Sequence, residues 1–392
     1  MTPPTETPTP VAERQSQTPS PAQGFTTTLS TFRDRVDREL SAFLAGKRPA
    51  AEGSLAELTE SVGVLIRGGG KRLRPLLVYQ THRALGGECA EAAVLPVALS
   101  TEMLHAYLLI HDDIMDHAEV RRGEPASHVQ FRQRHRQLGW PGDAADFGRS
   151  VAILVGDLAH CWAVELFQEG RRQAAVPIGP TASTPDLAAL DRAFCAMCEE
   201  VIGGQFLEMR MPFKAHCERP GETELVTALR LKSGRYSVER PLELGAILAG
   251  VDAAARAALA RYGQGAGEAF QLQDDVLGTF GDEVEVGKPV ASDLREGKHT
   301  LLVHYSLEGA SEIDGERLRS FLGRPDLSAD KVAEARDVLR RSGGLSLVRE
   351  RIDARLADAR AALRDDALRR GLTDEGRTFF EGMLDYLRER RA

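Results

Sequence analysis

The stretch "EMLHAYLLIHDDIMD" (residues 102–116) joins a long apolar run to three aspartates near its end. A helix turns by about 100° per residue. This places Leu108, Asp112 and Asp116 on one stripe, and His105 extends the stripe by one turn towards the N-terminus. The apolar neighbours on the other faces indicate that most of the helix is buried. The stretch therefore predicts a buried helix with acids at its C-terminal end.

The two acids on this stripe would repel each other in isolation. Asp112 and Asp116 are four residues apart, so their carboxylates lie about one turn apart on the same face. They also lie near a helix C-terminus, where negative charge is unfavourable. A divalent cation would reverse both effects, and Mg²⁺ commonly shares carboxylate ligands with substrate phosphates. A solvated acidic helix end is the alternative for this motif taken alone.

A second pair of acids occurs in "GEAFQLQDDVLGTFGD" (residues 267–282). The same helical projection separates a polar side from an apolar side. The polar side carries Gln271, Asp274, Asp275 and Gly278, and the apolar side carries Ala269, Leu272, Val276 and Phe280. Two helices with paired acids, in a chain without other metal motifs, suggest two carboxylate faces around one metal–phosphate site.

Basic residues cluster in "RGGGKRLRP" (residues 67–75). Pro75 suits the first turn of a helix, so Lys71, Arg72 and Arg74 lead into a helix N-terminus, where anions are favoured. The other cations that could face an anion are Arg121, Arg122, Lys232, Lys288 and Lys298. Such separate cations beside acid pairs fit a ligand with two polyanionic groups and several bridging Mg²⁺ ions. A solvated basic turn is the alternative for the first cluster alone.

The composition favours one large all-α domain. The 392 residues are 42% hydrophobic, helix formers dominate, and alternating β-branched patterns are absent. The net charge of −8 argues against a nucleic-acid-binding face. The segment 1–24 is rich in Pro, Thr and Ser, which predicts a disordered tail before a single domain over residues 25–392.

The compartment is expected to be the cytoplasm. The five cysteines form no disulfide framework, and the N-terminus shows no secretory signal. The longest apolar stretch is interrupted by Pro96, Glu102 and His105, so no membrane span is expected.

The chain resembles the trans-isoprenyl diphosphate synthases (polyprenyl synthetases), which include farnesyl and geranylgeranyl diphosphate synthases. The resemblance covers about residues 60–300 and rests on blocks in the family's order. These are "GGKRLRP", "EMLHAYLLIHDDIMD", "RRG", "GDLA", "GGQFLE", "KSGRYS", "FQLQDDVLGTFGD" and "GKPVASDLREGKHT". It implies an all-α isoprenoid-synthase fold, a helical bundle around a deep central cavity, and a homodimer.

The resemblance also implies the roles of individual residues. The residues similar to the isopentenyl diphosphate site are Lys71, Arg74, His105 and Arg122. Those similar to the contacts of the allylic diphosphate (C5, C10 or C15) are Arg121, Lys232, Ser233, Gln271, Lys288 and Lys298. The expected metal ligands are Asp112, Asp116, Asp274 and Asp275, for three Mg²⁺ ions, two on the first acidic motif and one on the second. A packed core histidine is the alternative for His105.

The implied reaction is a head-to-tail 1′-4 condensation. The catalytic set would be Asp112, Asp116, Asp274, Lys232 and Lys288. They would stabilise the leaving pyrophosphate while the double bond of isopentenyl diphosphate attacks the allylic cation. No protein nucleophile is needed.

Product length is expected to depend on the residues before the first acidic pair. Tyr107 lies five positions before Asp112 and Leu108 four positions before it. A single aromatic at the fifth position resembles the pattern of enzymes that stop near C20, which predicts geranylgeranyl diphosphate. Farnesyl diphosphate (C15) or a longer product is the alternative. The growing chain is expected to lie in an apolar cavity below Asp112, and the side chain that closes this cavity would set the product length. On an ideal helix Leu108 lies about 40° from Asp112 and Tyr107 about 140° from it, so Leu108 could close the cavity in place of Tyr107.

Two positions depart from the family pattern. Gly278 stands where the second motif often ends in Asp, and Ser233 stands where Thr is common. Because Gly278 replaces an acid of the second motif, the alternative function is that of a non-catalytic regulatory partner of a prenyl synthase. A His-Asp phosphohydrolase would leave the basic turn and the second acidic helix unexplained, and a terpene cyclase would not need Lys71 and Arg74.

Overall fold

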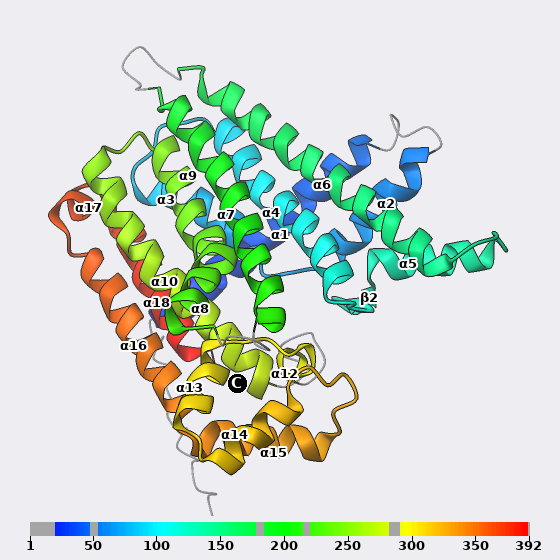
Figure 1. Ribbon diagram of the computed structural model, residues 1–392. Helices are drawn as coiled ribbons and strands as arrows, with labels where there is room; N and C mark the ends of the chain where they lie inside the picture. The colour runs from blue at the N-terminus through cyan, green and yellow to red at the C-terminus, as the bar shows by residue number, and fades with distance from the viewer. Residues whose placement is uncertain (1–19, 48–53, 178–183, 215–219, 282–290, 391–392) are drawn as a thin grey trace, which may run out of the picture.

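The computed structural model describes residues 20–47, 54–177, 184–214, 220–281 and 291–390. Within them the protein is almost entirely helical (Figure 1), which confirms the predicted all-α class. The first helices are α1 (Pro21–Lys47), α2 (Ser54–Arg67), α3 (Leu73–Ala84), α4 (Glu91–Met115), α5 (Ser127–Gln137), α6 (Ala144–Ala174) and α7 (Leu187–Lys214). The strands described are β1 (Val120–Arg121) and β2 (Glu124–Pro125), which form an antiparallel hairpin.

The C-terminal half continues the helical pattern and includes one π-helix, η1. Its elements are α8 (Glu222–Leu229), η1 (Arg230–Glu239), α9 (Arg240–Leu248), α10 (Ala253–Phe280), α12 (Ser292–Glu296), α13 (Leu301–Gly309), α14 (Glu312–Phe321), α15 (Ala329–Arg341), α16 (Gly344–Ala362), α17 (Asp366–Gly371) and α18 (Asp374–Glu389).

The N-terminal boundary differs from the expected one. α1 already begins at Pro21, so residues 21–24 belong to a helix and not to a tail. Ala22 and Phe25 are buried, and Phe25 packs against Phe379 and Tyr386 of α18. This apolar contact extends the helix beyond the predicted boundary. Residues 1–19, the rest of the expected tail, lie outside the described part of the chain.

α4 is the central helix and carries the predicted buried stretch. It packs most extensively against α6 and also against α3. By length and composition alone, α4 and α6 could each cross a membrane. The fold buries 67% of the most apolar segment of α4 and 44% of that of α6. A buried core helix passes the same criterion, and α4 supplies fully buried residues such as Val97, Met103 and Leu104.

Two of the other long helices, α6 and α10, begin where polar side chains cap them. The side chain of Asp143 accepts hydrogen bonds from the first turn of α6, and that of Asp252 accepts one from Ala255 of α10. Such caps satisfy N–H groups that have no partner within the helix. They fix the start of α10, the helix that carries the second acidic motif.

The π-helix η1 lies between α7 and α10, and glycines allow this close approach. A side chain at Gly204 of α7 would overlap the backbone nitrogen of Lys232, and one at Gly267 of α10 would lie 2.5 Å from the Gly234 carbonyl oxygen. π-Helical turns often occur at functional sites. Here the turn carries the "KSGRYS" block between the two acidic helices.

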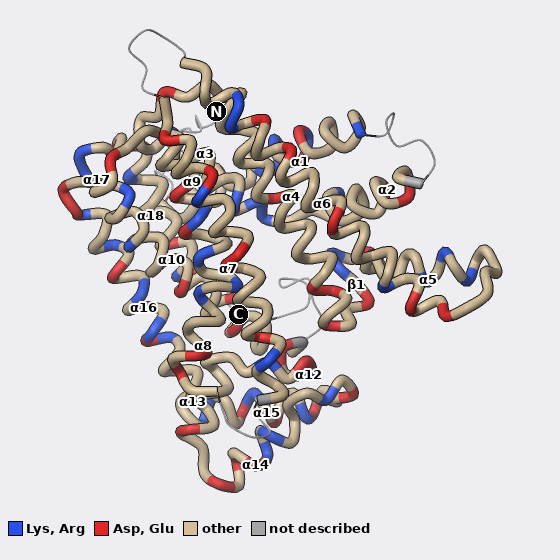
Figure 2. Tube along the Cα trace, turned by 45° about the horizontal axis from the view of Figure 1, so that its top comes forward, with Lys and Arg blue, Asp and Glu red and all other residues tan. Residues whose placement is uncertain are grey.

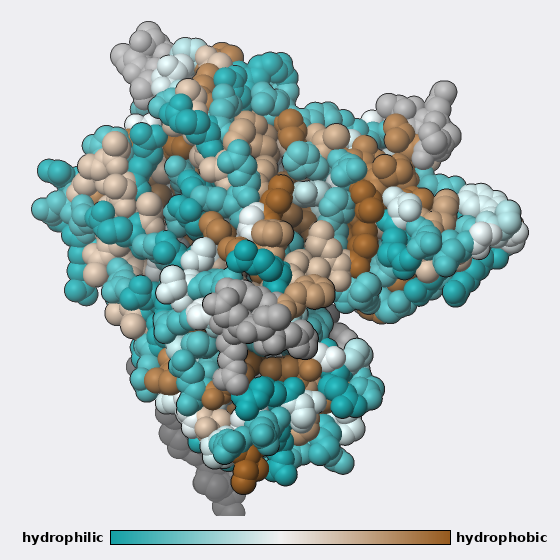
Figure 3. Space-filling view, in the orientation of Figure 1, coloured by the Kyte–Doolittle hydropathy of each residue, from teal (hydrophilic) through white to brown (hydrophobic). Residues whose placement is uncertain are grey.

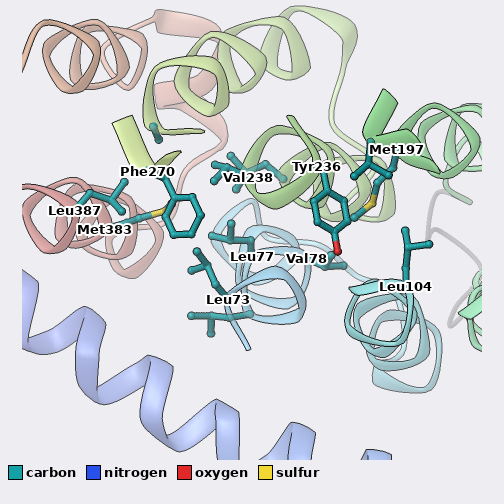
Figure 4. Packing of buried hydrophobic residues seen from close by; sticks show 14 of the residues in the cluster. Leu73, Leu77, Val78, Leu104, Met197, Tyr236, Val238, Phe270, Met383 and Leu387 are labelled. Atoms are coloured by element: carbon teal, nitrogen blue, oxygen red, sulfur yellow. The ribbon is translucent and has the colours of Figure 1, made fainter. Parts of the chain in front are cut away.

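One hydrophobic cluster extends from Phe25 in α1 to Leu387 in α18. In its centre Leu77 of α3, Val238 of η1 and Phe270 of α10 face one another (Figure 4). The predicted single domain over residues 25–392 stays a prediction, except that α1 begins at Pro21 and not at residue 25.

Candidate active site

The first acidic motif lies at the C-terminal end of α4, as the sequence predicted. Asp112 accepts a hydrogen bond from Gln205 Nε2 of α7 at 3.1 Å, and Lys232 Nζ of η1 lies 3.4 Å from the same oxygen. Arg121 Nη2 lies 3.7 Å from its other oxygen. Three separate elements therefore direct polar groups at this carboxylate.

Asp116 is the C-cap residue of α4 and lies mostly buried. Burial raises the pKa of its carboxyl, Lys298 lowers it and Asp112 raises it, and together they bring it to about 6. Lys298 Nζ lies 3.7 Å from Asp116 Oδ2. The two acids of the stripe therefore share one electrostatic environment, as the i,i+4 spacing predicted.

The middle acid of the motif, Asp113, points elsewhere. Its carboxylate is buried and accepts a hydrogen bond from Arg121 Nε at 2.8 Å. Arg121 was expected to contact an allylic diphosphate. In the structure the guanidinium of Arg121, in the β1–β2 hairpin, forms an ion pair with Asp113 at the end of α4. It also lies close to Asp112.

The second acidic motif lies on the polar side of α10, as projected. Asp275 accepts a hydrogen bond from Gln271 Nε2 at 2.6 Å. Burial and then Asp293 raise its pKa well above the ordinary value. Asp274 accepts a hydrogen bond from Arg390 Nη2 at 2.5 Å, so a residue close to the C-terminus reaches this motif.

A chain of charged side chains links the two motifs. Lys298 Nζ lies between Asp116 and Asp293, at 3.7 Å and 3.8 Å from their oxygens. A Cβ atom placed on Gly278 would overlap Asp293 Oδ2. The carboxylate of Asp293 therefore stands beside the position where the second motif lacks its last acid.

Two lysines occupy the space between the acidic helices. Burial lowers the pKa of Lys232, but Glu208 and Asp112 raise it by more, so it stays charged. Burial likewise lowers the pKa of Lys298, and Asp293, Glu208 and Asp116 raise it well above the ordinary value. Figure 2 shows acidic and basic segments together around β1 and α12.

The basic turn lies between α2 and α3, with Pro75 in the first turn of α3 as predicted. Arg74 Nη2 donates to Ser237 Oγ at 2.7 Å, and its guanidinium carbon lies 4.4 Å from the ring centre of Tyr236. Burial and Arg390 lower the pKa of Lys71, while Asp274 raises it. The turn therefore reaches the second acidic motif as well as η1.

His105 lies beside this turn. Burial lowers its pKa well below the ordinary value, and Arg74 and Arg122 lower it further, so the imidazole is neutral at pH 7. Its ring centre lies 6.1 Å from that of Tyr236. The hydroxyl of Tyr236 is buried, has no hydrogen-bond partner among the described residues and points towards α3 and α4 (Figure 4).

Tyr107 and Leu108 are both partly buried against the core. The ring of Tyr107 packs 4.8 Å from that of His111 and 5.1 Å from that of His160 of α6. The central cavity expected from the resemblance stays a prediction. One hollow of about 360 Å³ lies on the other side of α10 and is lined by Gln273, Val276, Arg349, Ile352, Asp353, Arg388 and Arg390.

Other expected contacts have less structural support. Ser233 is half-buried in η1, and Gln271 is engaged with Asp275. Lys288 lies outside the described residues. The residues that sequence reasoning did not single out are Gln205, Glu208, Tyr236, Asp293 and Arg390. Four of them stand in blocks already noted, but only their neighbours in space reveal them, and Arg390 had no sequence signal.

The donor set fits magnesium. Asp112, Asp116 and Asp274 each present carboxylate oxygens that basic side chains now approach. Among the described residues, no three metal-binding side chains lie together as a complete ligand cluster. Mg²⁺ is commonly held by one or two carboxylates, with waters and substrate phosphates as the other ligands. The carboxylates of Asp112, Asp116 and Asp274 therefore suit a Mg²⁺ ion whose other ligands are water and diphosphate oxygens.

Comparison with known proteins shows the family of the chain. The polyprenyl synthetase family model matches residues 56–339. Geranylfarnesyl diphosphate synthase of Aeropyrum pernix is 36% identical over 330 residues, which cover 83% of this chain and 92% of that protein. Farnesyl diphosphate synthase of Geobacillus stearothermophilus is 34% identical over 66% of this chain and 78% of its own.

A solved structure is also similar over nearly the whole chain. It is geranylgeranyl pyrophosphate synthase from Corynebacterium glutamicum, complexed with isoprenyl diphosphate and magnesium. The TM-score is 0.83 and the identity 32%, over 93% of this chain and 99% of that one. The predicted isoprenoid-synthase fold is thereby confirmed. The chain belongs to the polyprenyl synthetase family and is a short-chain trans-prenyltransferase.

Proposed function

We propose that this protein condenses isopentenyl diphosphate with an allylic diphosphate in a Mg²⁺-dependent head-to-tail 1′-4 reaction. One observation carries the proposal. The acidic faces of α4 and α10 are connected through Asp116, Lys298 and Asp293, and separate basic groups flank this line. Such a site can hold two diphosphates with their reactive carbons between them.

The allylic diphosphate belongs on the acidic side of this site. Three Mg²⁺ ions, two at Asp112 and Asp116 and one at Asp274, would neutralise the leaving pyrophosphate. Lys232 and Lys298 add fixed positive charge there, because neighbouring carboxylates keep both protonated. The sequence assigns the same role to Lys288, and Asp275 remains a candidate ligand.

Isopentenyl diphosphate belongs at the basic turn. Lys71, Arg74 and Arg122 come from two segments that meet beside His105. A neutral His105 donates a hydrogen bond without adding charge. The buried hydroxyl of Tyr236, which no group in the described part of the chain engages, is available to the same ligand. The proton released after condensation passes to the pyrophosphate, so no protein base is required.

The product proposed is geranylgeranyl diphosphate, with farnesyl diphosphate or a longer chain as the alternative. One relative named above is a farnesyl diphosphate synthase, whose product is shorter than C20. The other is a geranylfarnesyl diphosphate synthase, whose product is longer than C20. Tyr107 supports a stop near C20, because its ring is packed between His111 and His160 and cannot overlap an isoprene unit.

We further propose a cytoplasmic homodimer that binds no nucleic acid. Apolar patches are visible over α6 and α7 (Figure 3), where Leu154 is 55% and Phe206 63% exposed. A second copy of the chain would cover such surfaces.

The test is pyrophosphate release by the purified protein with isopentenyl diphosphate, Mg²⁺ and the C5, C10 or C15 primer. Release with at least one primer is expected. No release with any primer, although both diphosphates bind, would favour the regulatory-partner alternative. That alternative rested on Gly278, and the carboxylate of Asp293 beside Gly278 weakens its support.

A further inference from the structure

Glu102 of α4 is a buried carboxylate that contacts two basic segments. Its side chain is 2% exposed, and its Oε1 accepts a hydrogen bond from Arg72 Nη1 at 2.5 Å. Arg122 Nη2 lies 3.8 Å from the same oxygen. Arg72 belongs to the basic turn and Arg122 to the β1–β2 hairpin, so one acid joins two segments that are distant in sequence.

Arg72 cannot reach a substrate, because its side chain is fully buried. Its three guanidinium nitrogens are used inside the protein. Nε donates to Asp37 at 2.7 Å, Nη1 to Glu102 and Nη2 to the Ile66 carbonyl at 2.5 Å. A planar guanidinium that donates to three fixed partners also fixes the orientation of the backbone at Arg72.

Both arginines have a strained backbone. The φ angles of Arg72 and Arg122 are 52° and 54°, in the left-handed region that residues other than glycine rarely adopt. Arg122 Nη1 also donates to the Leu65 carbonyl at 3.0 Å, close to where Arg72 bonds to Ile66. Such strain persists only where surrounding contacts hold it, and Glu102 is the contact that both residues share.

Two cations of the basic turn lie close to the strained Arg72 in the sequence. Lys71 and Arg74 flank Arg72, and Arg74 leaves the turn to reach Ser237 of η1. Glu102 lies one turn before His105 on α4, so the histidine and the two basic segments are set by the same part of the helix.

We propose that Glu102 and Arg72 are positioning residues for isopentenyl diphosphate. Their buried ion pair fixes the basic turn and the hairpin so that Lys71, Arg74 and Arg122 converge on one diphosphate. This inference rests on the proposed function, because it takes the basic turn as the isopentenyl diphosphate site. It assigns no chemical step to either residue.

The test measures binding of isopentenyl diphosphate alone by isothermal titration calorimetry, where no turnover can occur. Glu102→Gln keeps the size of the side chain and removes its charge. We expect the Kd of isopentenyl diphosphate to rise at least tenfold, while the KM of the allylic primer stays within twofold. Glu268→Gln is the matched control, because Glu268 is also buried and accepts from Arg351 Nε at 2.7 Å, outside the basic turn. It should leave both constants unchanged.

Arg72→Lys provides the second variant, since lysine keeps the charge but cannot reach three partners at once. It should weaken isopentenyl diphosphate to a similar extent in a protein that stays folded. Unchanged affinity in either folded variant, or equal weakening of both substrates, would overturn the proposal. A wild-type protein that binds isopentenyl diphosphate but releases no pyrophosphate would instead refute the proposed function.

Discussion

At the scale of single residues, the three acids of the first motif divide into two roles. Asp112 lies beside Lys232 of η1, and Asp116 lies beside Lys298 after α12. Asp113 instead accepts a hydrogen bond from Arg121. Helical spacing explains the division, because positions i and i+4 share a face and position i+1 does not. The basic turn divides in the same way, with Arg72 inside the protein and Arg74 towards the site.

Lys71→Ala and Arg74→Ala should weaken isopentenyl diphosphate more than the allylic primer. Each removes a charge-assisted contact worth about 1.5–3 kcal/mol, or about 10–150-fold in KM. Steady-state kinetics with each substrate varied in turn would measure the difference. Lys331→Ala is a suitable control, because Lys331 is an exposed lysine of α15. A rise in the KM of the primer alone would mean that the two sites are reversed.

Magnesium affinity should fall as the pH falls below about 6. Burial raises the pKa of Asp116 to about 6, and Mg²⁺ binds the ionised form, so the proton competes with the metal below that value. The expected loss approaches tenfold per pH unit. The stability of the metal-free protein changes in the opposite direction. Its free energy of unfolding falls as the pH rises through 6, because the buried carboxyl of Asp116 with its raised pKa must then ionise.

Calorimetric titration of Mg²⁺ between pH 7 and pH 5 would measure this effect. Asp116→Asn should bind the metal more weakly and with a shallower pH dependence. Equal Mg²⁺ affinity at both pH values in the wild-type protein would contradict the assignment of Asp116 as a ligand.

Chain length should respond to Tyr107→Ala. The aromatic ring fills space between α4 and α6, so its removal should lengthen the product beyond C20. Leu108→Ala is the comparison, because Leu108 shares a stripe with Asp112. Mass spectrometry of the products would decide. Lengthening by Leu108→Ala alone would show that the helical projection was the better guide.

At the scale of elements, the site depends on how closely α7, η1 and α10 approach one another. Glycines at the contacts allow Lys232 to lie between the acidic helices. Gly204→Ala should push η1 away from α7, because its Cβ would overlap the backbone of Lys232. We expect kcat to fall at least tenfold and stability to fall by about 1–3 kcal/mol.

Gly203→Ala is the matched control for this prediction. A Cβ at Gly203 meets no atom of the described residues within 4 Å, although Gly203 is next to Gly204 on the same helix. Activity assays and thermal denaturation of both variants would compare them. Because alanine forms helices better than glycine, Gly203→Ala should leave activity and stability unchanged or raise stability slightly. An equal loss at the two positions would show that the contact with η1 does not explain the effect of Gly204→Ala.

The sequence predicted elements better than it predicted their contacts. Periodicity is a local property, so α4 and α10 and their acidic faces followed from spacing alone. The position of Asp293 beside Gly278 and the bond from Arg390 to Asp274 depend on packing between distant segments, which spacing does not reveal. The start of α1 at Pro21 was missed because its contacts with α18 outweigh a tail-like composition.

At the scale of the whole molecule, the fold places two acidic helix faces and a basic turn around one site. The first and last described helices close the bundle, since α1 packs on α18 and the residue after α18 reaches Asp274. The chain therefore forms its site from both of its halves. The similarity to a solved synthase likewise extends over 93% of the chain.

The central claim is that the acids of α4 and α10 serve one metal–diphosphate site. The most direct test is a double-mutant cycle on kcat with Asp112→Asn, Asp274→Asn and their combination, each checked for folding by circular dichroism. We predict a loss of about a hundredfold or more for each single variant and a combined loss far smaller than the product of the two, because both act on one leaving group. Near-normal turnover in either single variant, or fully multiplicative losses, would contradict the account.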